Sequence, residues 1–310
     1  MQDIIQPIHK ELLKKELNSE TFVRNTNKGN NEIYIFDHRN APKLLEEVGR
    51  LREVTFRAAG GGTGKPADID HFDIHDTAPY QQLIVWDPEL EEIVGGYRFI
   101  HCKKASIIGQ VPELATSHLF NFDQKFISEY YSSTIELGRS FVQPKYQPSP
   151  TNRNGLFSLD NLWDGLGAIV VDNPEIKYFF GKVTMYLDFN QKARDLILSF
   201  MNYYFPDNDK LLTPKRPLPL HTDTADFLEE LNNLTYKEGH KLLNGEVRDL
   251  GENIPPLINA YMNLSATMKT FGTALNDHFG DVEETGILVT IDDIYESKKD
   301  RHINTYSGKQ

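Results

Sequence analysis

The chain has 310 residues, of which 39% are hydrophobic and 25% charged, a composition typical of a folded globular protein and unlike a disordered or fibrous one. Acidic residues outnumber basic ones by 45 to 33, and the net charge of −12 argues against a general nucleic-acid surface, which must neutralise phosphates with Lys and Arg. A single cysteine, Cys102, excludes an intramolecular disulfide and leaves no Cys-based zinc spacing.

Helix and strand signals alternate near the N-terminus. Residues 1–17 predict a short helix, without the apolar core or cleavage site of a signal peptide. A strand is predicted at 32–36 and an amphipathic helix at 45–56, where apolar residues recur at helical spacing. A glycine run at 58–65 ends this helix, and the acidic segment 68–76 follows.

The middle of the chain predicts a meander. Strands are expected at 80–86, 92–100 and 133–142, with a turn at 87–89 and helical or irregular chain before the third strand. We expect these three strands to pair antiparallel.

The remainder predicts helix 156–171, strand 177–186 and helix 190–204. Segment 206–253 is polar and proline-bearing and then helical in pattern, so it is an insertion, an interdomain excursion or a linker. A helix is expected again from residue 254.

A buried strand is expected at 286–291, before a charged tail. No stretch approaches the roughly 18 apolar residues of a spanning helix. We therefore expect a cytoplasmic protein that meets a membrane at most peripherally.

The glycine run ends in Gly64-Lys65 and invites comparison with a phosphate-binding P-loop. Ala59 stands where the first glycine belongs, and Pro66 where Ser or Thr should bind magnesium. The preceding element is also predicted to be a helix. We interpret the run as a flexible loop or lid.

Two H-x4-D strings, His71 to Asp76 and His118 to Asp123, match the spacing of glycerolipid acyltransferases, in which Asp orients a catalytic His. The string is short enough to arise by chance in a chain with ten histidines. His71 and His75 beside several aspartates also raise a metal site, against which we favour a solvated acidic loop.

Residues 136–142 (ELGRSFV) form the most informative strand. Side chains two apart share a face, so we expect Glu136, Gly138 and Ser140 on one face and Arg139 with Leu137 and Phe141 on the other, unless a bulge re-aims one. The plain alternative is that Glu136 forms an ordinary ion pair with Arg98 or Arg52.

Several short strings occur in an order that resembles the acyl-homoserine-lactone synthases: L-R-x-x-x-F (51–56), D-x-x-D (70–73), G-x-R-F (96–99) and E-L-G-R (136–139). Further strings bring the chain closer to the ornithine-lipid and glycine-lipid N-acyltransferases, a branch often labelled hemolysins: V-x-P-x-Y (142–146), FSLDNLWDGLG (157–167), YFFGKV (178–183), I-P-P-L-x-x-A-Y (254–261) and F-G-D-V (279–282).

This resemblance implies a GNAT-like α/β fold with a mixed, largely antiparallel sheet flanked by helices. We expect an N-terminal helical extension at 1–30 and an acyltransferase domain at 31–310 with a helical insertion at about 206–253. The implied reaction moves a long, sometimes 3-hydroxylated, acyl group from the phosphopantetheine of acyl carrier protein to the amine of a small amino acid, glycine or ornithine. No metal or further cofactor is required, and acyl-coenzyme A is the alternative donor.

The resemblance also assigns the site. It matches family active-site positions to Arg52, Phe56, Asp70, Asp73, Arg98, Glu136 and Arg139, and Trp163 is added as a further substrate-binding residue. Glu136 is the expected general base, directly or through a water. A backbone N–H near Phe141 or Val142, where GNAT strands splay, is expected to stabilise the thioester oxygen.

The three arginines are suited to a substrate carboxylate or to holding the acidic residues, and the two aspartates to organising the arginines. One departure is informative, because the coenzyme A pyrophosphate loop R-x-x-G-x-G of common GNAT enzymes is absent after residue 142. A basic surface for the acidic carrier would then include Lys145, Arg153, Lys182 and Lys192, unless these are scattered solubilising charges.

Other functions compete with N-acylation. His118 and Asp123 would serve a lysolipid O-acyltransferase, the hemolysin label would imply a membrane-active protein, and the fold would also serve as a binding module without catalysis.

Overall fold

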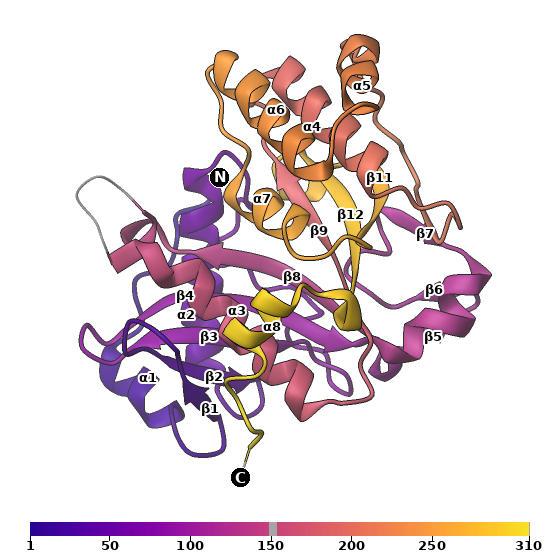
Figure 1. The fold of residues 1–310 in the computed structure, drawn as a ribbon. Helices are drawn as coiled ribbons and strands as arrows, with labels where there is room; N and C mark the ends of the chain where they lie inside the picture. Colours follow the sequence, from indigo (N-terminus) through magenta and orange to yellow (C-terminus); the bar gives the residue numbers. More distant parts are fainter. Residues whose placement is uncertain (149–153, 310) are drawn as a thin grey trace.

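The computed structural model describes residues 1–148 and 154–309. Within these residues, eight strands form one sheet in the order β1-β2-β3-β4-β8-β9-β12-β11, with helices on both faces (Figure 1). Neighbouring strands of this sheet run antiparallel except β8 and β9, which are parallel. The predicted fold class, a mixed and mostly antiparallel sheet flanked by helices, is confirmed.

The strands of the sheet are β1 (Phe22–Asn25), β2 (Glu32–Phe36), β3 (Gln81–Asp87), β4 (Glu92–His101), β8 (Thr134–Val142), β9 (Tyr178–Met185), β11 (Lys269–Asn276) and β12 (Val282–Thr290). Four short strands pair outside it, namely β5 (Ile107–Ile108) with β6 (Val111–Pro112), and β7 (Phe120–Phe122) with β10 (Leu212–Pro214). The described helices are α1 (Lys10–Glu16), α2 (Pro42–Ala58), α3 (Ser158–Asp172), α4 (Gln191–Tyr204), α5 (Ala225–Leu231), α6 (Tyr236–Asp249), α7 (Pro256–Met262) and α8 (Glu296–His302).

Alternating residues of β3 pack into two of the three hydrophobic cores that the described residues form. Leu83 and Val85 of β3 pack with α3 and α4, whereas Ile84 and Trp86 pack with α2. Helix α2 therefore covers one face of the sheet, and α3, α4 and α8 lie on the other (Figure 1). The site described below lies where the sheet opens between these two cores.

Local sequence signals explain where the main helices begin. The carboxylate of Glu16 accepts the backbone N–H groups of Lys43 and Leu44, in the first turn of α2 after Pro42. Asn190 caps α4 through its side chain. Thr235 and Glu238 form a reciprocal capping box at the start of α6.

The principal elements agree with the predicted ones to within a few residues, but two strands of the main sheet and the four short strands outside it were missed. Strand β11 has no clean alternation, because Gly272 adopts a left-handed φ of 84° where the register with β12 shifts. Strand β1 lies within the expected N-terminal helical extension, after α1, and adds to the edge of the sheet.

Segment 206–253 contains β10, α5 and α6. The segment packs on the rest of the protein, because β10 pairs with β7 and α6 packs against α4. An insertion is a segment that related chains lack, and contacts within this chain do not test that. The description of 206–253 as an insertion therefore stays a prediction. Among the described residues, no helix has the length and apolarity that crossing a bilayer requires.

Candidate active site

Strands β8 and β9 part from each other in the middle of the sheet. Their parallel pairing runs from Thr134 opposite Tyr178 to Glu136 opposite Phe180. Beyond this point β8 continues to Val142 against β4, and β9 continues to Met185 against β12. A wedge-shaped opening results, because β8 and β9 diverge while β8 stays paired with β4 and β9 stays paired with β12.

A cavity of about 700 Å³ occupies this opening, a size typical of small-molecule sites, which span about 300–1,000 Å³. Its walls come from both faces of the sheet. Thr55 and Phe56 of α2 lie on one side, and Leu159 of α3 with Ile258 and Tyr261 of α7 on the other. The cavity therefore passes through the sheet at the splay.

A bulge in β8 redirects the residues beside the cavity. Gly138 lies opposite Arg98 and Phe141 opposite Gly96, so Arg139 and Ser140 share a single partner position. Arg139 has a left-handed φ of 49°, unusual for a residue with a side chain. The expected face assignment is wrong beyond Gly138, because the bulge reverses the alternation.

After the bulge, Phe141 packs with α2, on the face of Glu136 and Arg98. Ser140 instead interacts with Tyr97, on the face of Leu137. Arg139 points towards the α2 side, where its guanidinium lies 4.3 Å from the ring centroid of Phe279. A bulge is one of the alternatives that the sequence leaves open, but residues 136–142 carry no signal for its position.

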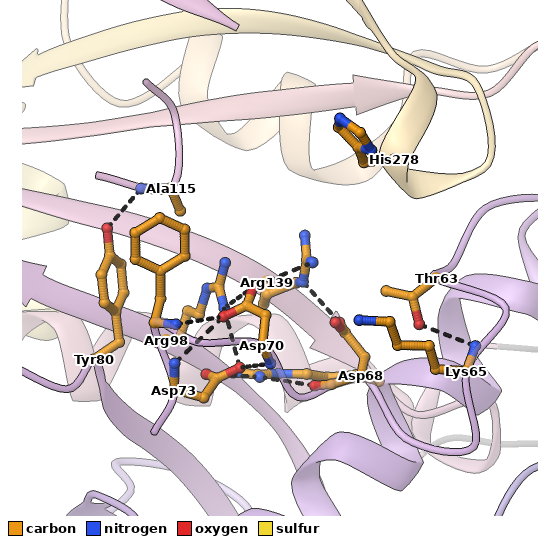
Figure 2. Close-up of polar contacts among 12 residues, drawn as sticks. Thr63, Lys65, Asp68, Asp70, Asp73, Tyr80, Arg98, Ala115, Arg139 and His278 are labelled. Atoms are coloured by element: carbon orange, nitrogen blue, oxygen red, sulfur yellow. Dashed lines mark hydrogen bonds and ion pairs between the residues drawn. The ribbon is translucent and has the colours of Figure 1, made fainter. Parts of the chain in front are cut away.

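Three arginines and three aspartates form a largely buried cluster beside the opening, called here the Arg–Asp cluster (Figure 2). It consists of Arg52, Arg98, Arg139, Asp68, Asp70 and Asp73. Arg98 contacts Asp70 at 2.8 Å and Asp73 at 3.1 Å, and Arg139 contacts Asp68 at 2.7 Å. Five of its six members were predicted site residues, and Asp68 was missed.

Asp73 holds the cluster together. Its carboxylate accepts from Arg52 at 3.2 Å, from Arg98 at 3.1 Å and from the side chain of Gln82 at 3.0 Å. Burial alone would raise the pKa of Asp73, but the two guanidinium groups outweigh burial and hold that pKa well below its usual range. The aspartates are thus placed to hold the arginines, and their organising role stays a prediction.

Glu136 lies on the same face of the sheet but is enclosed. Its side chain is 1% exposed and accepts hydrogen bonds from the hydroxyl of Tyr80 and, at 2.9 Å, from the backbone N–H of Thr116. Tyr80 in turn accepts from the backbone N–H of Ala115 (Figure 2). Glu136 forms neither ion pair considered for it and is not among the described residues that line the cavity. Its role as general base stays a prediction.

Phe141 and Val142 line the cavity at the end of β8. The backbone N–H of Gln143 donates to Val94 of β4 at 3.0 Å. Hydrogen-bonding directions alternate along a strand, so the N–H of Val142 points away from β4, towards the opening. This geometry agrees with the predicted position for the thioester oxygen, whose stabilisation there stays a prediction.

The two predicted aromatic residues separate. Phe56 lines the cavity and packs edge-on against Phe279, with ring centroids 4.9 Å apart. Trp163 does not appear among the described cavity residues and instead packs against Tyr261, which does. Any influence of Trp163 on substrate would therefore act through Tyr261.

The glycine run forms a loop around an internal carboxylate. Glu53 of α2 is fully buried and accepts from Thr63, from the N–H of Gly64 and from Arg57. Burial alone would raise the pKa of Glu53, but these hydrogen bonds lower it overall. The N–H groups of Thr63 and Gly64, which a P-loop would offer to phosphate, are directed at a protein side chain.

The structure does not bring His118 and Asp123 together as a catalytic pair. Nδ1 of His118 contacts the carbonyl oxygen of Ala115 at 2.6 Å, and Nε2 contacts the side chain of Asn276 at 3.4 Å. Asp123 accepts from the N–H of Lys125. In the described part of the chain, no cluster of three or more His, Cys, Asp or Glu side chains is arranged to hold a metal ion.

Three charged residues of the cavity, Asp160, Lys182 and Glu284, were not predicted to act in the site. Lys182 of β9 and Glu284 of β12 form an ion pair and both line the cavity. Lys182 was expected on a basic surface, which is wrong, because it lies on a central strand with its side chain only 11% exposed. Of the other expected surface residues, Lys145 pairs with Glu92, Lys192 is exposed and Arg153 lies outside the described residues.

Parallel strands that splay around a cavity, within a mostly antiparallel sheet, define the GNAT class of acyltransferase fold. Residues 51–154 match the family model described as an acetyltransferase (GNAT) domain. This stretch runs from α2 to the end of β8 and beyond, and so includes the Arg–Asp cluster.

Two curated relatives are similar over almost the whole chain. A glycine N(alpha)-acyltransferase of Bacteroides thetaiotaomicron is 55% identical over 307 residues, covering 99% of this chain and 91% of the relative. A glycine N(alpha)-acyltransferase of Phocaeicola vulgatus is 53% identical over 308 residues, covering 99% and 94%. The chain belongs to this family of GNAT-like N-acyltransferases, which confirms the family expected from its motifs.

Proposed function

We propose that the protein transfers a long fatty acyl group from acyl carrier protein to the amine of glycine, as a step in aminolipid synthesis. The observation that carries this proposal is the cavity that passes through the sheet at the splay of β8 and β9. Such a passage lets a thioester on one side meet an amine on the other, with both reactants held in one site.

The two sides of the cavity differ in chemistry, as the two substrates do. Towards α3 and α7 the lining is mostly apolar, with Leu137, Leu159, Leu257, Ile258 and Tyr261, although Ser158 and Asp160 of α3 also contribute. This side would bury the acyl chain and the pantetheine arm. Towards α2 and β12 the lining includes Arg139, Lys182 and Glu284, which suit a small charged acceptor.

Acyl carrier protein is favoured over coenzyme A as the donor. After β8 the chain turns through Pro144–Tyr146 in a short 3-10 helix, rather than through the glycine-rich loop that holds a pyrophosphate. A carrier protein presents only one phosphate and brings its own surface to the complex, so it needs no such loop.

Glycine is favoured over ornithine as the acceptor. Both relatives are named for glycine, and both are more than half identical to this chain over nearly its full length.

The N–H of Val142 would stabilise the oxyanion that forms when the amine attacks the thioester carbonyl.

A peripheral membrane contact would fit a lipid product. The β5–β6 hairpin exposes Ile107, Ile108 and Val111, with side chains outside the cores of the protein. Lys103 and Lys104 precede it in a short 3-10 helix. An apolar tip beside basic residues is the pattern of proteins that bind an anionic bilayer surface.

The test combines purified protein with 3-hydroxyacyl carrier protein and a panel of amino acids, following free thiol and product mass. We expect thiol release that depends on glycine, with the mass of the acyl-glycine product, and much weaker release with ornithine. Release with ornithine alone would replace glycine as the acceptor. Release with a lysolipid but with no amino acid would make the protein an O-acyltransferase and contradict the proposal.

A further inference from the structure

Lys182 and Glu284 form a buried ion pair that faces the cavity. Residues paired across adjacent strands share a face, and Thr184 lies opposite Glu284 while Gly286 lies opposite Lys182. The two charged side chains therefore sit on one face of the sheet, 11% and 2% exposed. Both belong to the cavity lining, on the face that also carries Glu136.

A buried ion pair of this kind does not by itself favour folding. Desolvation of two charges often exceeds their mutual attraction, and apolar residues of similar volume can replace a buried pair without loss of stability. Burial lowers the pKa of Lys182 even though Glu284 favours its charged form. A cost of this kind points to a function for the pair.

The carboxylate of Glu284 is held firmly on one oxygen. Its Oε2 accepts from Lys182 and, at 2.9 Å, from Asn276, whose side-chain oxygen contacts His118. Among the described residues, the one contact of Oε1 is long, 3.3 Å from the hydroxyl of Thr184. Oε1 thus keeps capacity for another donor, such as an ammonium group in the cavity.

We propose that Lys182 and Glu284 are the amino-acid subsite: the Lys182 ammonium binds the α-carboxylate of the acceptor, and the Glu284 carboxylate binds its ammonium and removes a proton. This inference rests on the proposed N-acyltransferase function and names the residues that recognise its acceptor. A zwitterion placed against an ion pair alternates positive and negative charges, so the site stays electrically neutral.

The arginines beside the cavity are less suited to this task. Arg52 and Arg98 are fully buried against Asp68, Asp70 and Asp73, and Arg139 is paired with Asp68. Arg52 and Arg98 are also not among the described cavity residues, whereas Lys182 is.

The chemical step balances in protons and electrons. Glu284 takes one proton from the acceptor ammonium, and the free amine attacks the thioester carbon through its lone pair. The C–N bond forms and the C–S bond breaks, so sulfur leaves with the bonding electron pair as a thiolate. The second amine proton goes to this thiolate, giving the amide and free pantetheine thiol, and Glu284 then releases its proton to solvent.

The experiment compares glycine with glycinamide, which keeps the amine but lacks the carboxylate charge, in wild type, Lys182→Met and Glu284→Gln. Losing a hydrogen bond to a charged group should lower the glycine-to-glycinamide ratio of kcat/KM in Lys182→Met roughly 10- to 100-fold. Glu284→Gln should lower kcat/KM for both amines roughly 100- to 10,000-fold, because both must lose a proton. Lys237→Met and Glu229→Gln, which replace exposed residues of α6 and α5, are the matched controls.

The double variant Lys182→Met/Glu284→Gln is the control for loss of folding, because it removes both charges of the pair and leaves neither buried without its partner. We expect its Tm to stay near that of wild type while the glycine preference is lost. A glycine preference retained in Lys182→Met or in the double variant would overturn the inference, even with an active wild type. Wild-type protein that releases no thiol with any amino acid would instead contradict the proposed function itself.

Discussion

Two groups of charged side chains lie in or beside the cavity, and they differ in how far they contribute to its lining. In the Arg–Asp cluster every charged group pairs with an opposite charge inside the protein. Of this cluster only Arg139 is among the described cavity residues, whereas both members of the Lys182–Glu284 pair are, and Oε1 of Glu284 has a long contact of 3.3 Å with Thr184. We infer that the Arg–Asp cluster shapes the site, whereas the Lys182–Glu284 pair contacts the substrate.

Asp73→Ala should have the largest effect, because it leaves Arg52 and Arg98 buried without their shared partner. Breaking a buried charge pair from one side costs about 3–5 kcal/mol. Urea denaturation would measure the loss, and Asp76→Ala, an exposed aspartate of the same segment, is the control. An equally small change in both variants would mean that the cluster does not hold the fold.

Glu136→Gln distinguishes two carboxylates on the same face of the sheet, those of Glu136 and Glu284. It replaces an acceptor of the Thr116 N–H or the Tyr80 hydroxyl with a donor, so we expect a loss of about 1.5–3 kcal/mol in stability. Its effect on kcat/KM at a temperature well below Tm should be smaller than that of Glu284→Gln. The reverse order of the two activities would return the role of general base to Glu136.

Gly181→Ala probes the start of the splay. An added Cβ would lie 2.8 Å from the carbonyl oxygen of Leu137, where β8 and β9 separate. Backbone shifts of this kind cost about 1–3 kcal/mol, and they should also change KM for the acyl donor. Gly245→Ala on α6, where a Cβ meets open space, should be neutral or stabilising and serves as the control.

The smallest effect is expected from Glu53, another carboxylate satisfied within the protein. Its pKa lies below the ordinary 4.5 in the folded state, so its contribution to stability is present above pH 4.5 and is lost as the pH falls through the lower folded value. The Tm difference between wild type and Glu53→Gln should therefore narrow below pH 4.5. A difference that stays constant down to pH 3 would show that the loop does not depend on this charge.

The same comparison shows what the sequence could reveal. Five members of the Arg–Asp cluster fall in short strings whose order identifies the family, and those strings located them. Asp68 stands just outside such a string and was missed. Lys182 and Glu284 come from strands far apart in the chain, and only the pairing of β9 with β12 joins them.

Other features had no sequence signal at all. The bulge places Arg139, a residue with no preference for a left-handed φ, in that conformation. The hydrogen bonds that enclose Glu136 come from Tyr80, on the segment before β3, and from Thr116, in the connection between β4 and β8. A one-dimensional pattern predicts strands and faces, but it does not predict which loop closes over a side chain.

The passage through the sheet has a kinetic consequence. Because the cavity is lined from both faces, a thioester held on the side of α3 and α7 and an amino acid held on the side of α2 need not share an entrance. On the proposed function, the two substrates would bind together, and the acyl group would pass from the thioester to the amine without a covalent intermediate on the protein. The sheet would then keep the two reactants apart except in the opening between β8 and β9.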